Sequence, residues 1–103
     1  MLEENYSLNP ARFKEVLHAV FLGSRGFDAE KGATDFSDES AQIKYFYSLN
    51  SKKTVLLIDS TKFHKSYNYT GLEFNMIDAL VTDKQPDTSI IEVCNKHDIE
   101  LLF

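Results

Sequence analysis

Two glycine-punctuated or polar stretches carry the residue types that bind small polar ligands, and the first of them spans residues 23–26. It follows a short apolar run (19–22), and its glycines let a ligand approach the backbone closely. It lacks the spacing of a phosphate-binding P-loop and of a dinucleotide fingerprint. A turn that needs positive φ is the alternative explanation. The candidate binding residues are Gly23, Ser24, Arg25 and Gly26.

The second stretch, residues 59–62, comes directly after the apolar run 54–58. Its acid, Asp59, is a candidate for orienting a sugar hydroxyl, and Lys62 is a candidate for meeting a phosphate as a point charge. The alternative is that Asp59 caps a helical turn and that Lys62 is solvated. Both alternatives remain open from the sequence.

Three further charged residues are candidates for the same ligand. Glu39 and Lys44 lie five positions apart in a predicted helix, which is not a same-face spacing, so we expect one to face the ligand crevice and the other to face solvent. Two solvated charges are the alternative. Asp28 lies close to the 23–26 stretch, but no paired acid and base for proton transfer is evident around it.

No pattern of metal-binding or nucleophilic residues is present. His18, His64 and His97 are far apart and share no ligand spacing, so we expect neither a metal nor a cofactor. The single cysteine, Cys94, lies on an apolar helix face, where a role in the core is expected.

Composition limits the partners of the chain. Its 103 residues predict one domain. A net charge of -5 argues against direct binding of nucleic acid, because phosphate neutralisation needs clustered Lys and Arg. No apolar stretch approaches the length of a membrane helix, the start is acidic, and one cysteine fits a reducing compartment, so we expect a cytoplasmic location without membrane contact.

Strand and helix patterns alternate along the chain. Apolar runs predict strands over 19–22, 54–59, 77–83 and 99–103, of which 54–59 is typical of a strand buried on both faces. Helices are expected over 10–18, from Ser37 with Ile43, Phe46 and Tyr47 on the apolar face, and from Pro86. Residues 23–36 and 60–75 are expected to be loops. The order predicts an α/β fold with a mostly parallel sheet and helices on its faces. Ligands of such sheets bind at the carboxyl ends of strands, here 23–26, 59–62 and 82–84.

Taken in order, these stretches resemble the C-terminal part of the effector-binding domain of DeoR-family bacterial transcription regulators. The resemblance covers about residues 19–103 and is most specific at D-S-T-K-F (59–63) and I-D-A-L-V-T-D (77–83). It implies a sensor domain with the fold of ribose-5-phosphate isomerase and glucosamine-6-phosphate deaminase. Such regulators are typically repressors of sugar metabolism that a phosphorylated sugar releases.

The resemblance also implies that parts of such a regulator lie outside this chain. These parts are the N-terminal winged helix-turn-helix that reads DNA and the first section of the sensor with its phosphate-cradling loop. We therefore expect residues 1–103 to form one partial sensor domain that reaches DNA only through the missing module and forms a homo-oligomer. We expect no catalysis. The alternatives are a small sugar-phosphate isomerase-like enzyme and a stand-alone interaction module.

Overall fold

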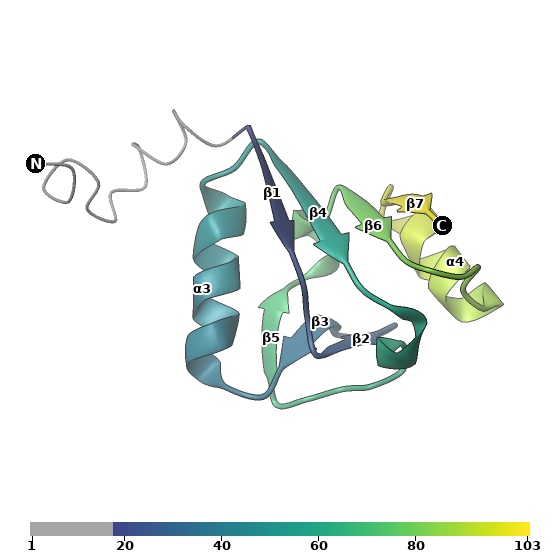
Figure 1. Cartoon of the computed structure of the whole chain (residues 1–103), viewed down its shortest axis with the longest axis horizontal. Coiled ribbons are helices and arrows are strands. Elements are labelled where there is room, and N and C mark those ends of the chain that lie inside the picture. Colours follow the sequence, from purple (N-terminus) through teal and green to yellow (C-terminus); the bar gives the residue numbers. More distant parts are fainter. Residues whose placement is uncertain (1–17) are drawn as a thin grey trace, which may run out of the picture.

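The computed structural model describes residues 18–103 (Figure 1). The helix expected over 10–18 lies, except for its last residue, outside the described residues. The described part is an α/β structure with one parallel sheet, one antiparallel sheet and two α-helices. None of its helices is long and apolar enough to cross a membrane.

Sheet A contains the four strands that the apolar runs predict. Its order is β1 (Ala19–Leu22), β4 (Lys53–Leu57), β6 (Ala79–Val81) and β7 (Glu100–Leu102), and every neighbouring pair is parallel. The prediction of a parallel sheet is therefore confirmed for these strands. All four carboxyl ends point the same way, as the arrowheads of Figure 1 show.

Sheet B corrects the prediction of loops over 23–36 and 60–75. It is antiparallel, in the order β2 (Gly26–Asp28), β3 (Gly32–Asp35) and β5 (Tyr69–Leu72). Gly32, the first residue of β3 after the turn from β2, has a φ of 91°, a conformation that favours glycine. Strands of three or four residues that contain glycines show no clear alternation, so their apolar pattern did not reveal them.

The two helices begin at the residues that the capping signals indicate. Helix α3 (Asp38–Leu49) begins after Ser37, whose hydroxyl oxygen accepts a hydrogen bond from the Ser40 amide at 3.2 Å. Helix α4 (Thr88–Lys96) begins after Asp87, whose carboxylate accepts from the Ile90 amide at 3.2 Å. Two short 3₁₀ turns complete the structure, η1 (Ser60–Lys62) and η2 (Phe74–Met76).

The buried face of α3 differs from the expected one. Ala41 and Ser48 are buried, whereas Ile43, which was expected to face the core, is 50% exposed. The reason is close backbone packing: a Cβ added to Gly71 of β5 would lie 3.2 Å from the Ala41 Cα atom. Only small side chains fit between elements that approach so closely.

The main core lies on one face of sheet A. Leu56 and Leu80 of this face are completely buried, and burial of each such side chain contributes about 1.5–3 kcal/mol. The expectation that 54–59 is buried on both faces holds for Val55 and Leu56, which point to opposite faces and are 8% and 0% exposed, but not for Leu57, which is 46% exposed. Sheet B and α4 cover the first face with the side chains of Phe27, Ala33, Leu72, Ile90 and Cys94, which confirms the core position of the cysteine.

Candidate functional site at the carboxyl ends of sheet A

The carboxyl ends of β1 and β4 lie directly beside each other. A Cβ placed on Gly23, the residue after β1, would lie 3.7 Å from the carbonyl oxygen of Leu57, the last residue of β4. The Gly23 stretch and the Asp59 turn are therefore neighbours, as expected for strand ends in a parallel sheet. The described contact is an ordinary van der Waals distance, and Gly23 has no positive φ, so neither packing nor backbone strain demands glycine here.

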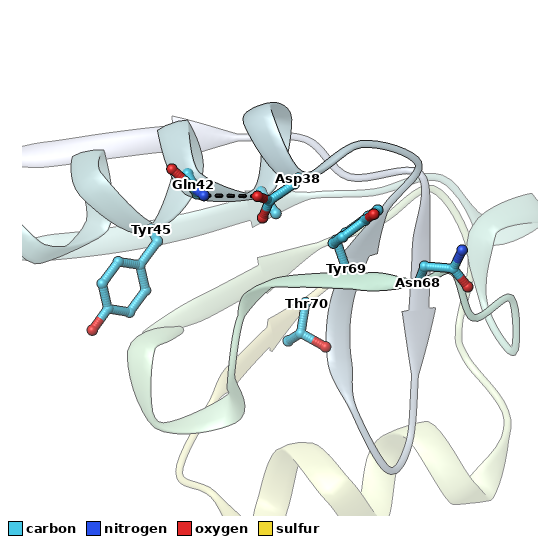
Figure 2. A pocket seen from close by; sticks show the side chains of 7 residues that line it. Asp38, Gln42, Tyr45, Asn68, Tyr69 and Thr70 are labelled. Carbon is cyan, nitrogen blue, oxygen red and sulfur yellow. Dashed lines mark hydrogen bonds between the residues drawn. The ribbon is translucent and has the colours of Figure 1, made fainter.

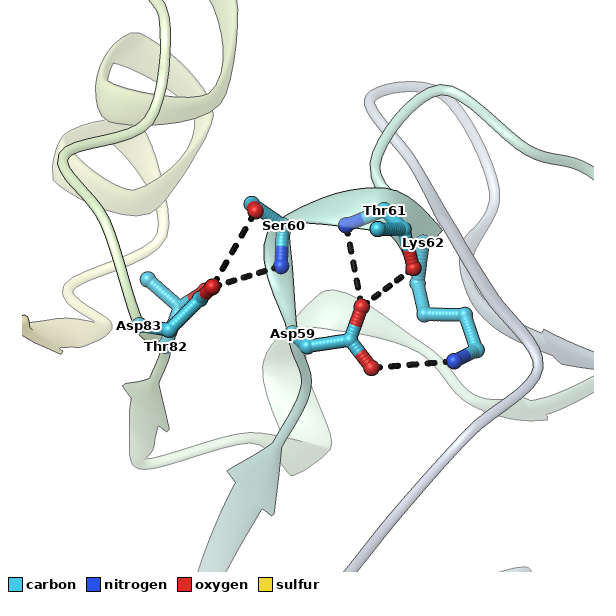
Figure 3. Close-up of polar contacts among 6 residues, drawn as sticks. All are labelled: Asp59, Ser60, Thr61, Lys62, Thr82 and Asp83. Carbon is cyan, nitrogen blue, oxygen red and sulfur yellow. Dashed lines mark hydrogen bonds and ion pairs between the residues drawn. The ribbon is translucent and has the colours of Figure 1, made fainter.

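A dense set of hydrogen bonds holds the η1 turn after β4 (Figure 3). Asp59 caps the turn: one carboxylate oxygen accepts from the Thr61 amide at 3.0 Å and from the Thr61 hydroxyl. The other oxygen accepts from the Lys62 Nζ at 3.0 Å. The hydrogen bonds from Thr61 and Lys62 lower the pKa of Asp59 to about 2. The predicted alternative, a capping role for Asp59, is thus confirmed, and the carboxylate is ionised at neutral pH.

Asp83, which was not among the predicted binding residues, fixes the same turn from β6. Its carboxylate accepts from the Ser60 amide at 2.7 Å and from the Ser60 hydroxyl at 3.3 Å (Figure 3). The hydrogen bond from the Ser60 amide also lowers the pKa of Asp83. The sequence predicted a strand end over 82–84. It did not single out Asp83, because an acid after a strand has the same local pattern as an acid that caps a following helix.

These contacts decide what η1 offers to a ligand. The Ser60 and Thr61 amides already bind carboxylates, so they are not donors for a phosphate group. Two ionised, exposed carboxylates, Asp59 and Asp83, remain as strong acceptors. Such a turn suits the hydroxyl groups of a sugar or polyol better than an anion.

The 23–26 stretch is divided between structural and exposed groups. The Ser24 hydroxyl lies 2.7 Å from the Thr34 carbonyl oxygen and 3.1 Å from that of Gly26, and so holds the chain where it turns into β2. Arg25 is exposed, and its guanidinium lies over the Phe36 ring at 5.0 Å from the centroid, a cation–π geometry. Gly23 and Arg25 are therefore the parts of this stretch that face outward.

Gly26 has an internal reason to be glycine. A Cβ there would lie 2.9 Å from the Lys65 carbonyl carbon and nearer still to its oxygen. The segment after η1 runs beside β2, with a bridge between Phe27 and Phe63 and a hydrogen bond from the His64 amide to the Phe27 carbonyl at 2.8 Å. The alternative of a positive φ is wrong for Gly26, because among the glycines only Gly32 has one.

The other three candidate residues make no hydrogen bond or ion pair with η1 among the described contacts. Asp28 accepts from the Glu30 amide at 3.3 Å, in the turn between β2 and β3. Lys44 forms an ion pair of 2.5 Å with Asp35, which is only 2% exposed. Glu39 is exposed on α3 and makes no described contact with Lys44. It borders a groove of about 400 Å³ together with Gln42, Ile43, Phe46 and Tyr47.

A second hollow lies between the start of α3 and the start of β5 (Figure 2). It has a volume of about 240 Å³, and none of its lining residues was a predicted site residue. Along its rim, the Asp38 carboxylate accepts a hydrogen bond from the side-chain Nε2 of Gln42 at 2.8 Å. The lining residues are Asp38, Ala41, Gln42, Tyr45, Asn68, Tyr69 and Thr70.

A side-chain hydrogen bond also ties the η1 region to α4. The His64 Nε2 atom lies 2.6 Å from a carboxylate oxygen of Asp87, the cap of α4. Hydrogen bonds from Ser89 and His64 lower the pKa of Asp87 to about 2. Within residues 18–103, no three His, Cys, Asp or Glu side chains gather in a way that holds a metal ion.

The parallel sheet with a polar turn at its carboxyl ends is an α/β arrangement in which ligands commonly bind at the strand ends. A sequence profile described as the DeoR C terminal sensor domain matches residues 13–84. The chain belongs to this family, as its motifs predicted.

Curated relatives agree with that assignment. The glycerol-3-phosphate regulon repressor of Escherichia coli K12 is 29% identical over 80 residues, which cover 78% of this chain and 32% of the relative. The deoxyribose operon repressor of the same strain is 25% identical over 104 residues, 96% of this chain and 41% of the relative. The HTH-type transcriptional repressor GlcR of Bacillus subtilis 168 is 28% identical over 74 residues, 72% of this chain and 29% of the relative. The chain thus spans about a third of the length of these relatives, which are transcription repressors.

Proposed function

We propose that this chain is the effector-sensing part of a DeoR-type repressor of sugar metabolism, and that a phosphorylated sugar or polyol binds at the carboxyl ends of β1 and β4. The observation that carries this proposal is the contact between Gly23 and the end of β4, beside two ionised carboxylates on η1. A glycine that no contact within the described chain requires leaves room for a ligand at that point.

The hydrogen bonds of η1 support one orientation of the effector. Its hydroxyl groups lie against Asp59, and its phosphate lies away from η1, where the amides are already bound to carboxylates. Arg25 is the exposed cation of the 23–26 stretch and supplies charge for the phosphate. Lys62 balances Asp59 and donates its remaining hydrogens to the ligand.

The proposed sensor acts by a shift of populations. A phosphorylated sugar that binds one quaternary arrangement better than another changes the spacing of DNA-reading modules. The DNA-reading module and the isomerase-like remainder of the sensor fold are parts of the longer regulator, outside residues 1–103. We further propose that the domain is not catalytic, because the relatives that it matches are transcription repressors.

The test is a titration with phosphorylated sugars and polyols, beginning with glycerol 3-phosphate and deoxyribose 5-phosphate. Calorimetry and NMR measure the Kd of each ligand. Asn caps turns as well as Asp does, so Asp59→Asn keeps η1 while removing the charged acceptor. We expect its Kd to rise about tenfold to a hundredfold, because hydrogen bonds to charged groups contribute about 1.5–3 kcal/mol. The matched control is Asp28→Asn, which changes an acid in the β2–β3 turn.

Three results contradict the proposal. They are the absence of binding by any phosphorylated sugar, an equal response of both variants, and an unchanged affinity in Asp59→Asn. Chemical conversion of the sugar that disappears in Asp59→Asn supports the isomerase-like alternative instead.

A further inference from the structure

Arg25 lies in a small cluster with two aromatic rings, called here the Arg25 cluster (Arg25, Phe36 and Tyr67). The guanidinium of Arg25 lies over the Phe36 ring, 5.0 Å from its centroid. The Phe36 and Tyr67 rings meet edge to face, with centroids 4.6 Å apart and an interplanar angle of 89°. The three residues come from the stretch after β1, the residue after β3 and the segment before β5, so the fold brings them together.

Hydrogen bonds to Thr34 fix the backbone of this cluster. The Thr34 carbonyl accepts from the Arg25 amide at 3.2 Å and from the Ser24 hydroxyl at 2.7 Å. The Thr34 hydroxyl oxygen accepts from the Tyr67 amide at 3.1 Å, and the residue is completely buried. The segments that carry Arg25 and Tyr67 are therefore attached to the same buried residue, two positions before Phe36 in the chain.

Stacking on Phe36 leaves the hydrogen-bond donors of the guanidinium free. The ring contacts the flat face of the group, whereas the N–H groups lie in its plane and point away from its edges. Within residues 18–103, no carboxylate forms an ion pair with Arg25, whereas Lys62 is paired with Asp59. A guanidinium edge of this kind binds two oxygens of one phosphate group at the same time.

We propose that Phe36 is a positioning residue that orients the Arg25 guanidinium for the phosphate group of the effector, and so favours phosphorylated over unphosphorylated sugars. The inference rests on the proposed function for the presence of an effector at the strand ends. An arginine side chain that is ordered before the ligand arrives loses less conformational freedom on binding. Cation–π contacts at exposed sites are weak, so the ring should change the affinity by a factor of about two to five.

The first experiment needs no sugar. NMR of the full chain records the side-chain protons of Arg25, which the face of an aromatic ring shifts upfield, and a titration with inorganic phosphate follows the Arg25 Nε–H signal. We expect Phe36→Leu to remove the upfield shift and to weaken phosphate binding, and Phe36→Tyr to preserve both. Phe103→Leu is the matched control, because Phe103 is 64% exposed and Phe36 is 58% exposed. Arg25 protons at the positions of a disordered peptide in the parent chain overturn the proposal, even if Phe36→Leu unfolds.

The second experiment compares the Kd of glycerol 3-phosphate for Phe36→Leu, Arg25→Gln and the double variant. The Kd should rise about twofold to fivefold in Phe36→Leu and further in Arg25→Gln. The double variant should match Arg25→Gln alone, because the ring acts only through the guanidinium.

Two results of these titrations overturn the proposal. They are an Arg25 signal that inorganic phosphate leaves unchanged, and a double variant in which loss of the Phe36 ring weakens binding as much as it does in the parent chain. The latter result would assign Phe36 a purely structural role. Failure of glycerol 3-phosphate and deoxyribose 5-phosphate to bind, together with the expected response to inorganic phosphate, contradicts the proposed function but supports the role of Phe36.

Discussion

Substitution by alanine should destabilise the domain at one of two glycines near the strand ends and leave its stability unchanged at the other. Gly26→Ala places a methyl group against the backbone of Lys65, 2.9 Å from its carbonyl carbon and closer to its oxygen. A backbone atom cannot rotate aside, so the 63–67 segment must move away from β2. Gly23→Ala places the same methyl group 3.7 Å from its nearest described neighbour, the Leu57 carbonyl oxygen, which is an ordinary contact.

The loss of stability in Gly26→Ala can be estimated from the contacts that the displaced 63–67 segment loses. Overpacking of this kind costs about 1–3 kcal/mol. Displacing the segment also weakens the hydrogen bond from the His64 amide to the Phe27 carbonyl, worth about 1 kcal/mol. We therefore expect a loss of about 2–4 kcal/mol in the free energy of unfolding. For a domain of this size that lowers the Tm by about 10 °C or more.

Equilibrium unfolding in urea, followed by circular dichroism, measures both variants. Gly23→Ala should stay within about 0.5 kcal/mol of the parent chain, because nothing in its surroundings has to move. Its affinity for the phosphorylated sugar should nevertheless fall. A Gly26→Ala variant as stable as the parent, or a Gly23→Ala variant equally destabilised, would refute the packing described for the 23–26 stretch.

Three other measurements test the described contacts. Lys44→Met should cost about 3 kcal/mol in urea unfolding, because it leaves the buried Asp35 carboxylate without its cation, and adding Asp35→Asn should recover part of that loss. The pKa values of Asp59 and Asp87 lie at about 2 in the folded chain, against an ordinary value of 3.8. The stability that these carboxylates contribute is therefore complete above pH 4 and disappears as the pH falls towards 2. Acid titrations of Asp59→Asn and Asp87→Asn should each show a smaller loss of folding stability over that range than the parent chain. Burial raises the pKa of the Cys94 thiol, so a thiol reagent should react with it slowly in the folded chain and rapidly in denaturant.

The parallel sheet was predictable because its strands are continuous apolar runs that end in polar residues. Sheet A follows those runs closely, and the caps at Ser37, Asp59 and Asp87 follow from side chains that accept hydrogen bonds from nearby amides. Local sequence carries all of this information. Sheet B was not predictable in this way, because its strands are short and depend on contacts with distant segments, such as the pairing of β3 with β5.

The candidate site also combines features that local sequence predicts with features that depend on contacts between distant residues. The neighbourhood of Gly23 and Asp59 followed from the rule that parallel strands end at one edge of a sheet. The part played by Asp83 depends on a hydrogen bond to Ser60, 23 positions away, which no local pattern encodes. Lys44 was a binding candidate from its spacing to Glu39 in the predicted helix, yet its ion pair with Asp35 depends on how α3 packs against β3.

Strand β4 joins the core to the candidate site. Ile58 is buried in the core, and its amide donates to the carbonyl of Val81, the last residue of β6, at 3.0 Å. Asp59, the next residue, caps the η1 turn. A ligand that shifts η1 therefore acts on a segment held directly by the core of sheet A. Thermodynamic linkage then requires that any arrangement of the regulator favoured by the effector binds that effector more tightly by the same factor.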